Sequence, residues 1–191
     1  MAYRRSVRSY TEERVKQEDI DMIINAGRFS PTGCNNQTVG YIIIKENVQE
    51  FRKIASAKLT GVVLNNISAT VNKVTLERIY NSANTDEDRL FFDAPLVIAI
   101  TDIKENSIDA AIAASRMEMM ANALGIGVCF NGIFTKISNI EPEIRKMCGL
   151  NDGRRVITTL VIGHPAVSYQ RPPKRKKERT NCRNFLINYK L

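Results

Sequence analysis

Hydrophobic positions along the chain follow two periods, and these periods predict an alternation of helices and strands. Apolar residues recur every three or four positions over four segments, which we expect to be helices: 16–29, 47–59, 107–124 and 138–148. Short runs of β-branched or apolar residues predict strands over three segments: 39–45, 95–101 and 155–163. Residues 60–88 show neither period clearly, so the pattern assigns them no element.

The interleaving of these elements predicts one domain over residues 1–191. The chain has no internal repeat and no linker-like segment, and 43% of its residues are hydrophobic. A chain of this size can build its core without disulfides or metals. Alternating helices and strands indicate an α+β fold with a mixed central β-sheet flanked by helices. The longest apolar run, 94–100, is far shorter than the roughly 20 residues of a membrane-spanning helix, so we expect no membrane partner.

Cysteine and histidine are too sparse to favour a metal site or a histidine-dependent mechanism. The four cysteines form no CxxC pair, and His164 is the only histidine, so we expect no metal. A histidine base would have to be His164, whose Gly-His-Pro context is typical of a turn after a strand. Few, scattered thiols are typical of a reduced protein, and we expect a cytoplasmic one.

The net charge of +8 is concentrated at the two ends of the chain. Five basic and two acidic residues lie within 1–16, and seven basic and one acidic residue lie within 171–183. Three interpretations are open: solvated tails, a nucleic-acid-binding arm, or a site for a small anion. The absence of tryptophan and of any nucleic-acid-binding motif argues against the second. The third requires the two ends to meet in space.

Two other features carry no cofactor signal of their own. The glycine-rich segment 125–132 is not a dinucleotide-binding loop, because GxGxxG would need glycine at Phe130 and the segment follows a predicted helix. The methionines of the 107–124 helix are typical of core packing, since methionine commonly fills gaps between helices.

Five short motifs occur in order along the chain. They are RRSVR at 4–8, SPTGCNNQ at 30–37, FFDAP at 91–95, LGIGVCFNG at 124–132, and VIGHP followed by RPPKRK within 161–176. In this order they resemble the nitroreductase family of FMN-dependent flavoproteins, over the whole chain apart from 60–88. The resemblance implies a nitroreductase-like α+β fold and a homodimer with FMN sites at the subunit interface. It also implies a C-terminal extension that packs on the partner, and reduction by NADH or NADPH.

The resemblance assigns the N-terminal motif to the cofactor. Four residues would contact the phosphate, the ribityl chain and the pyrimidine edge of FMN: Arg4, Arg5, Ser6 and Arg8. Their chemistry agrees with this assignment, because a guanidinium offers a planar donor fork that matches a phosphate. A frayed basic N-terminus is the structural alternative.

The second motif would approach the flavin of the partner subunit. The resemblance assigns cofactor contacts to five of its residues: Pro31, Thr32, Gly33, Asn35 and Gln37. Side-chain amides both donate and accept hydrogen bonds, which suits the alternating C=O and N–H groups of a flavin edge. Thr38 and Val39 replace the Pro-Trp pair usual in the family, which leaves the local packing open. Cys34 is either redox-active or an inert small residue, and the second interpretation is favoured.

Two further segments complete the expected site. Asn131 and Gly132 correspond to the position at the reactive N5 edge of the flavin, where glycine permits close backbone approach. The segment after the last strand would bring Lys174, Arg175 and Lys176 onto the phosphate. Both basic ends would then converge on one anion.

We therefore expect an FMN-dependent oxidoreductase that uses NAD(P)H to reduce a small organic acceptor by ping-pong two-electron transfer. The acceptor would be a nitroaromatic or quinone-like compound, and the flavin would carry the chemistry without a catalytic side chain. The alternative is a flavin-binding or nucleic-acid-associated protein without reductase turnover, favoured by the missing Pro-Trp pair and the surplus basic tail. The sequence leaves the acceptor and the choice between NADH and NADPH open.

Overall fold

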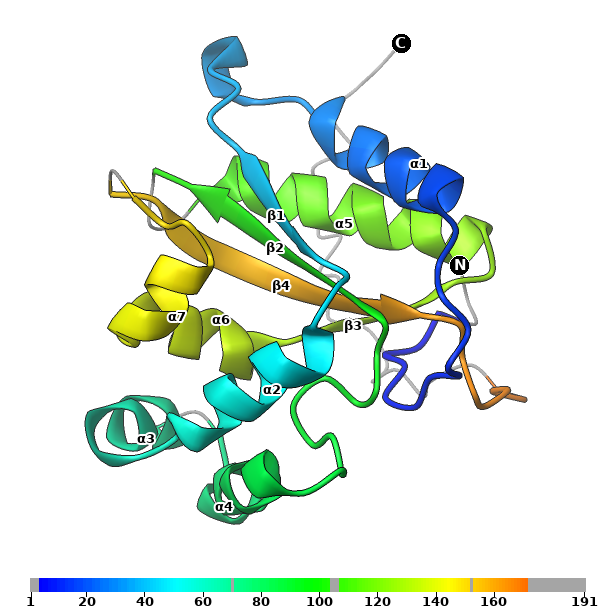
Figure 1. Cartoon of the computed structure of the whole chain (residues 1–191). Helices are drawn as coiled ribbons and strands as arrows, with labels where there is room; N and C mark the ends of the chain where they lie inside the picture. Colours follow the sequence, from blue (N-terminus) through cyan, green and yellow to red (C-terminus); the bar gives the residue numbers. More distant parts are fainter. Residues whose placement is uncertain (1–3, 70, 104–106, 152, 172–191) are drawn as a thin grey trace, which may run out of the picture.

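A β-sheet lies at the centre of the fold, between two layers of helices (Figure 1). The computed structural model describes residues 4–69, 71–103, 107–151 and 153–171. Within these residues the sheet has four strands, in the order β1-β2-β4-β3: β1 (Gly40–Ile44), β2 (Leu96–Asp102), β3 (Gly127–Phe130) and β4 (Arg155–Gly163). All three pairings are antiparallel, and a parallel bridge between Ser6 and Val128 adds the N-terminal arm, residues 4–11, to the β3 edge. The expected α+β class is confirmed.

Helices cover both faces of the sheet (Figure 1). The α-helices of the described residues are α1 (Gln17–Arg28), α2 (Val48–Ala57), α3 (Gly61–Ser68), α4 (Lys73–Asn81), α5 (Ile108–Ala123), α6 (Gly132–Ile140) and α7 (Pro142–Met147). Short 3-10 turns occupy Gly33–Asn35 and Ser82–Asn84. Helices α1 and α5 pack on one face, and α2, α6 and α7 lie on the other, with α3 and α4 beyond them.

Three expectations from the periodicity need correction. The single helix predicted over 138–148 is wrong: α6 ends at Ile140 and α7 begins at Pro142, which has no N–H to continue a preceding helix. Segment 125–132 contains the strand β3, which is only four residues long and too short to show a period. The unassigned residues 60–88 contain α3 and α4, two short helices.

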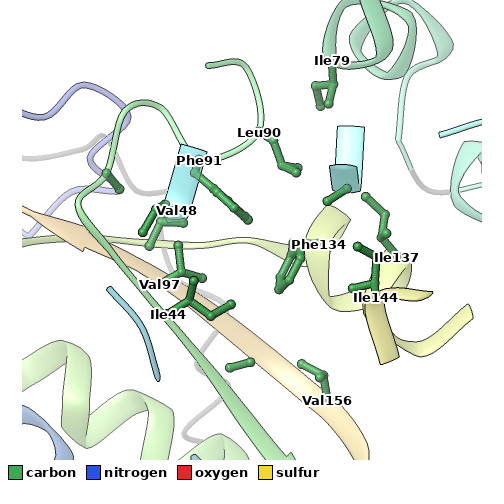
Figure 2. Packing of buried hydrophobic residues seen from close by; sticks show 14 of the residues in the cluster. Ile44, Val48, Ile79, Leu90, Phe91, Val97, Phe134, Ile137, Ile144 and Val156 are labelled. Atoms are coloured by element: carbon green, nitrogen blue, oxygen red, sulfur yellow. The ribbon is translucent and has the colours of Figure 1, made fainter. Parts of the chain in front are cut away.

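Strand β2 is buried along its whole length. Its residues Leu96, Ile98 and Ile100 pack in the same cluster as α1 and α5, whereas Val97 and Ala99 belong to the cluster on the opposite face. This two-sided burial explains why the strand is a continuous apolar run in the sequence. Figure 2 shows the second cluster, in which Val97 lies beside Ile44, its register partner on β1.

The second cluster has an aromatic centre. The rings of Phe91 and Phe134 meet edge to face with centroids 5.0 Å apart, and Phe51 meets Phe134 in the same way at 6.0 Å. Aromatic pairs favour this geometry because the positive ring edge meets the negative ring face. Phe134 thereby ties α6 to α2 and to the segment that precedes β2.

The N-terminal arm lies against the sheet at two facing glycines. Gly127 and Gly163 are register partners on β3 and β4. A Cβ at Gly127 would lie 2.8 Å from Cγ2 of Val7. A Cβ at Gly163 would lie 2.6 Å from Cδ of Pro95 and 3.0 Å from the ring of Tyr10. The arm therefore depends on the absence of both side chains for its close approach.

We expect Gly163→Ala to lower the free energy of unfolding by about 1–3 kcal/mol. The added methyl group would meet a proline ring and the buried ring of Tyr10, and neither can rotate away. Urea unfolding measures the loss. The exposed substitution Ser168→Ala is the control and should change stability by less than about 0.5 kcal/mol. Equal stability of the two variants would contradict the packing described for the arm.

Candidate functional site

The basic N-terminal arm, drawn in dark blue, runs next to the orange segment that follows β4 (Figure 1). The N–H of Thr11 donates a hydrogen bond to the carbonyl oxygen of His164 at 2.9 Å. A guanidinium nitrogen of Arg5 donates to the carbonyl oxygen of Arg171 at 3.3 Å, across 166 residues of sequence. Of the C-terminal basic run 171–183, only Arg171 belongs to the described residues, and it contacts the arm. Three expected phosphate contacts lie outside the described residues: Lys174, Arg175 and Lys176.

Tyr10 fixes the arm to the sheet. Its buried hydroxyl lies 2.8 Å from the carbonyl oxygen of Val7 and 3.0 Å from that of Val161, and donates a hydrogen bond shared between them. Burial raises the pKa of Tyr10 well above its usual value, so the hydroxyl keeps its proton. The backbone of the arm is therefore held at a fixed position on β4.

The three arginines of the arm have different surroundings. Arg4 forms an ion pair with Glu118 of α5 at 2.8 Å. The guanidinium carbon of Arg5 lies 4.8 Å from the ring centroid of Tyr169. Arg8 lines a cavity beside β3 and the start of α6. Only Arg4 of the three has an acidic partner recorded among the described residues.

The cavity beside Arg8 has a volume of about 390 Å³. Asn131 and Gly132 line it at the junction of β3 and α6, and α4 supplies Ile79 to its wall. No atom outside its own chain neighbours lies within 4 Å of the position that a Cβ of Gly132 would take, so this glycine leaves open space at the start of α6. The segment to which the sequence pattern assigned no element therefore contributes to the site.

The side chain of Asn131 is used within the protein. Its Oδ1 accepts from the N–H of Phe134 at 2.9 Å and caps α6, while its Nδ2 donates to the carbonyl oxygen of Leu90 at 2.6 Å. Its backbone N–H donates to the carbonyl oxygen of Thr159 at 2.8 Å. Of the two residues predicted here, Gly132 is therefore the better placed to meet a bound molecule.

The second motif forms a loop after α1, on the β1 side of the sheet (Figure 1). The N–H of Gly33 donates to both carboxylate oxygens of Asp109 in α5, at 3.1 and 3.2 Å. Cys34, Asn35 and Gln37 have φ angles of 52°, 55° and 50°, which residues with a Cβ rarely adopt. The Nε2 of Gln37 donates to Oδ1 of Asn35 at 3.1 Å, so the two predicted amides lie together on an exposed loop.

The remaining residues of this loop have simpler positions. Pro31 is exposed, as is Cys34. Thr32 accepts a hydrogen bond from the backbone N–H of Gln37 and lines a hollow of about 320 Å³ next to α1. Val39, at the position where the family usually has Trp, packs against the α1–α5 side of the core. The loop therefore has an ordered connection into β1 even with Thr38 and Val39 in place of the Pro-Trp pair.

Helix α5 separates the loop from the arm. Asp109 holds the loop and Glu118 holds Arg4, and the two residues are nine positions apart in this helix. At 3.6 residues per turn they lie on opposite sides of the helix, and at 1.5 Å per residue they are about 13 Å apart along its axis. Neither the cavity beside Arg8 nor the hollow beside Thr32 is lined by residues of both groups.

The family model described as the nitroreductase family matches residues 1–164. The chain belongs to the nitroreductase family. A Bacillus subtilis (strain 168) protein named FMN reductase (NAD(P)H) is 27% identical to this chain over 184 residues. The alignment covers 96% of this chain and 72% of the relative. A second protein of that organism, named FMN reductase (NADPH), is 25% identical over 181 residues, 91% of this chain and 68% of the relative.

Solved nitroreductase structures share the fold. A nitroreductase with bound FMN from Desulfitobacterium hafniense DCB-2 has a TM-score of 0.73 at 22% identity, covering 94% of this chain and 93% of that one. A nitroreductase with bound FMN from Bacteroides fragilis NCTC 9343 has a TM-score of 0.72 at 19% identity, covering 93% and 92%. At these identities the likeness concerns the fold.

Helix α5 carries apolar side chains on its outward face as well as its inward one. Ala114 and Met117 are buried under the helix, whereas Ile108 is 74% exposed and Met119 is 49% exposed. Phe29, at the end of α1, is 80% exposed, and it lines a groove of about 620 Å³ between the two helices together with Met119. Exposed apolar side chains that gather on one face of a helix commonly mark a surface that another molecule covers.

Two absences concern only the described residues. No group of three or more His, Cys, Asp or Glu side chains in this part of the chain could hold a metal ion. None of its helices is long and apolar enough to span a membrane. His164, the one histidine, lies 3.8 Å from the carboxylate of Glu13, and its Nε2 makes no hydrogen bond within the same part of the chain.

Several contributors to the site carry no recognisable signal in the sequence. Asp109 and Glu118 are acidic residues on a long helix, where such residues normally face solvent. Tyr169 lies in an irregular segment and belongs to none of the motifs. The sequence shows that the two acidic residues are nine positions apart, but it does not show which group each of them binds.

We expect Asn131→Asp to lower the free energy of unfolding by about 1–3 kcal/mol at neutral pH. Aspartate still caps α6, but it cannot donate to Leu90 and its charge would face that carbonyl oxygen. Burial would raise the pKa of the new carboxyl, so the loss should shrink as the pH falls and the carboxyl is protonated. Urea unfolding at two pH values measures both effects.

The matched control is Asn72→Asp. Asn72 is the exposed N-cap of α4 and accepts a hydrogen bond from the N–H of Val74 at 2.9 Å, a role that aspartate can take over. Its stability should change by less than about 0.5 kcal/mol. Similar losses at Asn72 and Asn131 would show that the hydrogen bond to Leu90 contributes nothing.

Proposed function

We propose that this chain is an FMN-dependent oxidoreductase that uses NADH or NADPH to reduce a small organic acceptor, such as a nitroaromatic or a quinone-like compound. Membership of the nitroreductase family and the relatives named FMN reductase support the proposal. The observation that carries it is the contact of Arg5 in the basic arm with Arg171 after β4, at the same edge of the sheet as the cavity at Gly132.

The residues present fit a phosphorylated flavin. The guanidinium groups of the arm carry N–H donors in a planar fork, and the oxygens of a phosphate can accept hydrogen bonds from it. The cavity has basic side chains in its lining and no acidic one: Arg8, Arg89 and Lys136. Arg89 is also paired with Glu87. Apolar side chains such as Phe92 and Ile133 line the same cavity and suit the face of an aromatic ring system.

FMN, when bound, supplies the redox chemistry, accepting two electrons from the nucleotide and passing them to the acceptor in ping-pong order. The chain binds and orients the reactants. Arg8 places positive charge in the cavity, where it stabilises the negative charge that reduction adds to the ring system. Asn131 fixes the first turn of α6 so that Gly132 presents open backbone to the cavity. No side chain is assigned a proton-transfer step.

The proposal includes a homodimer, because one chain does not bring the loop and the arm together. Asn35 and Gln37 lie on the loop held by Asp109, and Arg4 lies on the opposite side of α5. A second copy that covers the apolar outward face of α5 would bury Ile108 and fill the groove between α1 and α5. Its loop could then complete the site formed by the arm of the first copy.

The purified chain should bind FMN and turn over with NAD(P)H. We expect a flavin absorbance at about 450 nm that persists through gel filtration, bleaches on adding NADH or NADPH without oxygen, and returns on adding a quinone or a nitroaromatic. Absence of FMN binding would overturn the proposal. Binding without bleaching by either nucleotide would support a flavin-binding protein without reductase turnover instead.

Mixing two defective variants tests whether each site is shared between two copies. Asn35→Ala/Gln37→Ala removes the loop amides, and Arg8→Ala removes a basic side chain of the cavity; each variant should lose most of its activity. Refolded together in equal amounts, they form heterodimers with one intact site, and about a quarter of the wild-type activity should return. Two loop-defective preparations mixed in the same way are the control and should recover nothing. Failure of the mixed sample to recover would place each complete site within one chain.

A further inference from the structure

Tyr169 contacts two of the residues predicted to bind the cofactor. The guanidinium carbon of Arg5 lies 4.8 Å from the centroid of its ring, within the distance of about 6 Å at which a cation–π attraction acts. Its hydroxyl lies 3.5 Å from the carbonyl oxygen of Ser6. Tyr169 is half-buried in the segment after β4, and the N–H of Ala166 holds that segment to Ser9 of the arm at 3.0 Å.

The partners of Arg5 differ in kind from those of Arg4. Arg4 meets a carboxylate, Glu118, which neutralises its charge. Arg5 meets an aromatic ring and the carbonyl oxygen of Arg171, and no ion pair of Arg5 is recorded among the described residues. Neutral groups therefore hold Arg5, and no acid in the described part of the chain cancels its positive charge.

The geometry of a guanidinium makes this arrangement suitable for binding an anion. All five N–H donors of arginine lie in the guanidinium plane, whereas an aromatic ring contacts its face. The contact with the Tyr169 ring thus orders the side chain without occupying a donor in a hydrogen bond, and one donor is bonded to Arg171. A side chain ordered before binding loses less conformational entropy when the anion arrives.

We propose that Tyr169 is a positioning residue for the phosphate of the cofactor: it holds the guanidinium of Arg5 so that its in-plane N–H groups face the phosphate. This inference rests on the proposed function, since it takes FMN as the cofactor. It assigns to Tyr169 a part in choosing a phosphorylated flavin over one without phosphate.

Titration of the flavin-free protein with FMN and with riboflavin tests the proposal, because riboflavin lacks the phosphate. Quenching of flavin fluorescence gives the Kd of each. Tyr169→Leu should raise the Kd for FMN about three- to tenfold and leave that for riboflavin unchanged, as expected for the loss of a partly exposed cation–π contact. Tyr169→Phe keeps the ring and should stay within about twofold of wild type for both flavins.

Two further variants make the test specific. Tyr80→Leu makes the same chemical change at an exposed tyrosine of α4 and should alter neither Kd. Tyr169→Gln removes the ring without exposing a new apolar side chain, and it replaces Tyr169→Leu if that variant does not fold. Arg5→Met should reproduce the loss of FMN affinity, and adding Tyr169→Leu to it should cost nothing more, because the two residues act through one contact.

The outcomes separate this proposal from the proposed function. Equal weakening of FMN and riboflavin in Tyr169→Leu would make Tyr169 a structural support only and overturn the inference. So would a Tyr169→Phe variant that behaves like Tyr169→Leu, or a wild-type protein that binds both flavins equally. A wild-type protein that binds neither flavin would remove the proposed function, and the inference with it.

Discussion

The docking of the N-terminal arm on the β3–β4 edge is the constraint on which the candidate site depends. The arm has one parallel bridge to β3, and its close approach requires that Gly127 and Gly163 lack side chains. The Tyr10 hydroxyl then fixes its backbone from the buried side. Because β4 lies next to β2 at the centre of the sheet, the position of the cationic arm is set by the most buried strands of the protein.

A second constraint comes from α5, which organises both halves of the site without lining the cavity itself. Its inward face packs on the sheet through alanines and Met117, which allows a close approach. One carboxylate, Asp109, ties down a loop whose residues adopt unfavourable φ angles. Another, Glu118, pairs with Arg4 on the opposite side of the helix. A rigid helix therefore sets the spacing of two groups that no local contact connects.

Periodicity predicted those elements whose burial is regular. Strand β2 and helix α5 match their expected ranges closely, because continuous burial and a long helical repeat leave strong patterns. The division between α6 and α7 at Pro142 and the four-residue β3 were missed, since each depends on a few residues. The convergence of the basic ends was an expectation from the family resemblance, and the described residues show only its first contact, between Arg5 and Arg171. The internal hydrogen bonds of Asn131 depend on tertiary contacts with Leu90 and Thr159 that no local pattern contains.

The two arginines at the start of the arm differ in the groups that hold them. A cation paired with a carboxylate, as Arg4 is with Glu118, positions the chain but adds little net attraction for an anion. Arg5 is held by an aromatic ring and a carbonyl oxygen, so among the described residues its charge is not neutralised and only one of its donors is used. The arm thus combines one arginine whose charge is neutralised in fixing it to α5 with another whose charge remains available. Both are needed, because a free charge on a loosely held arm would lose much of its attraction to the entropy of ordering it.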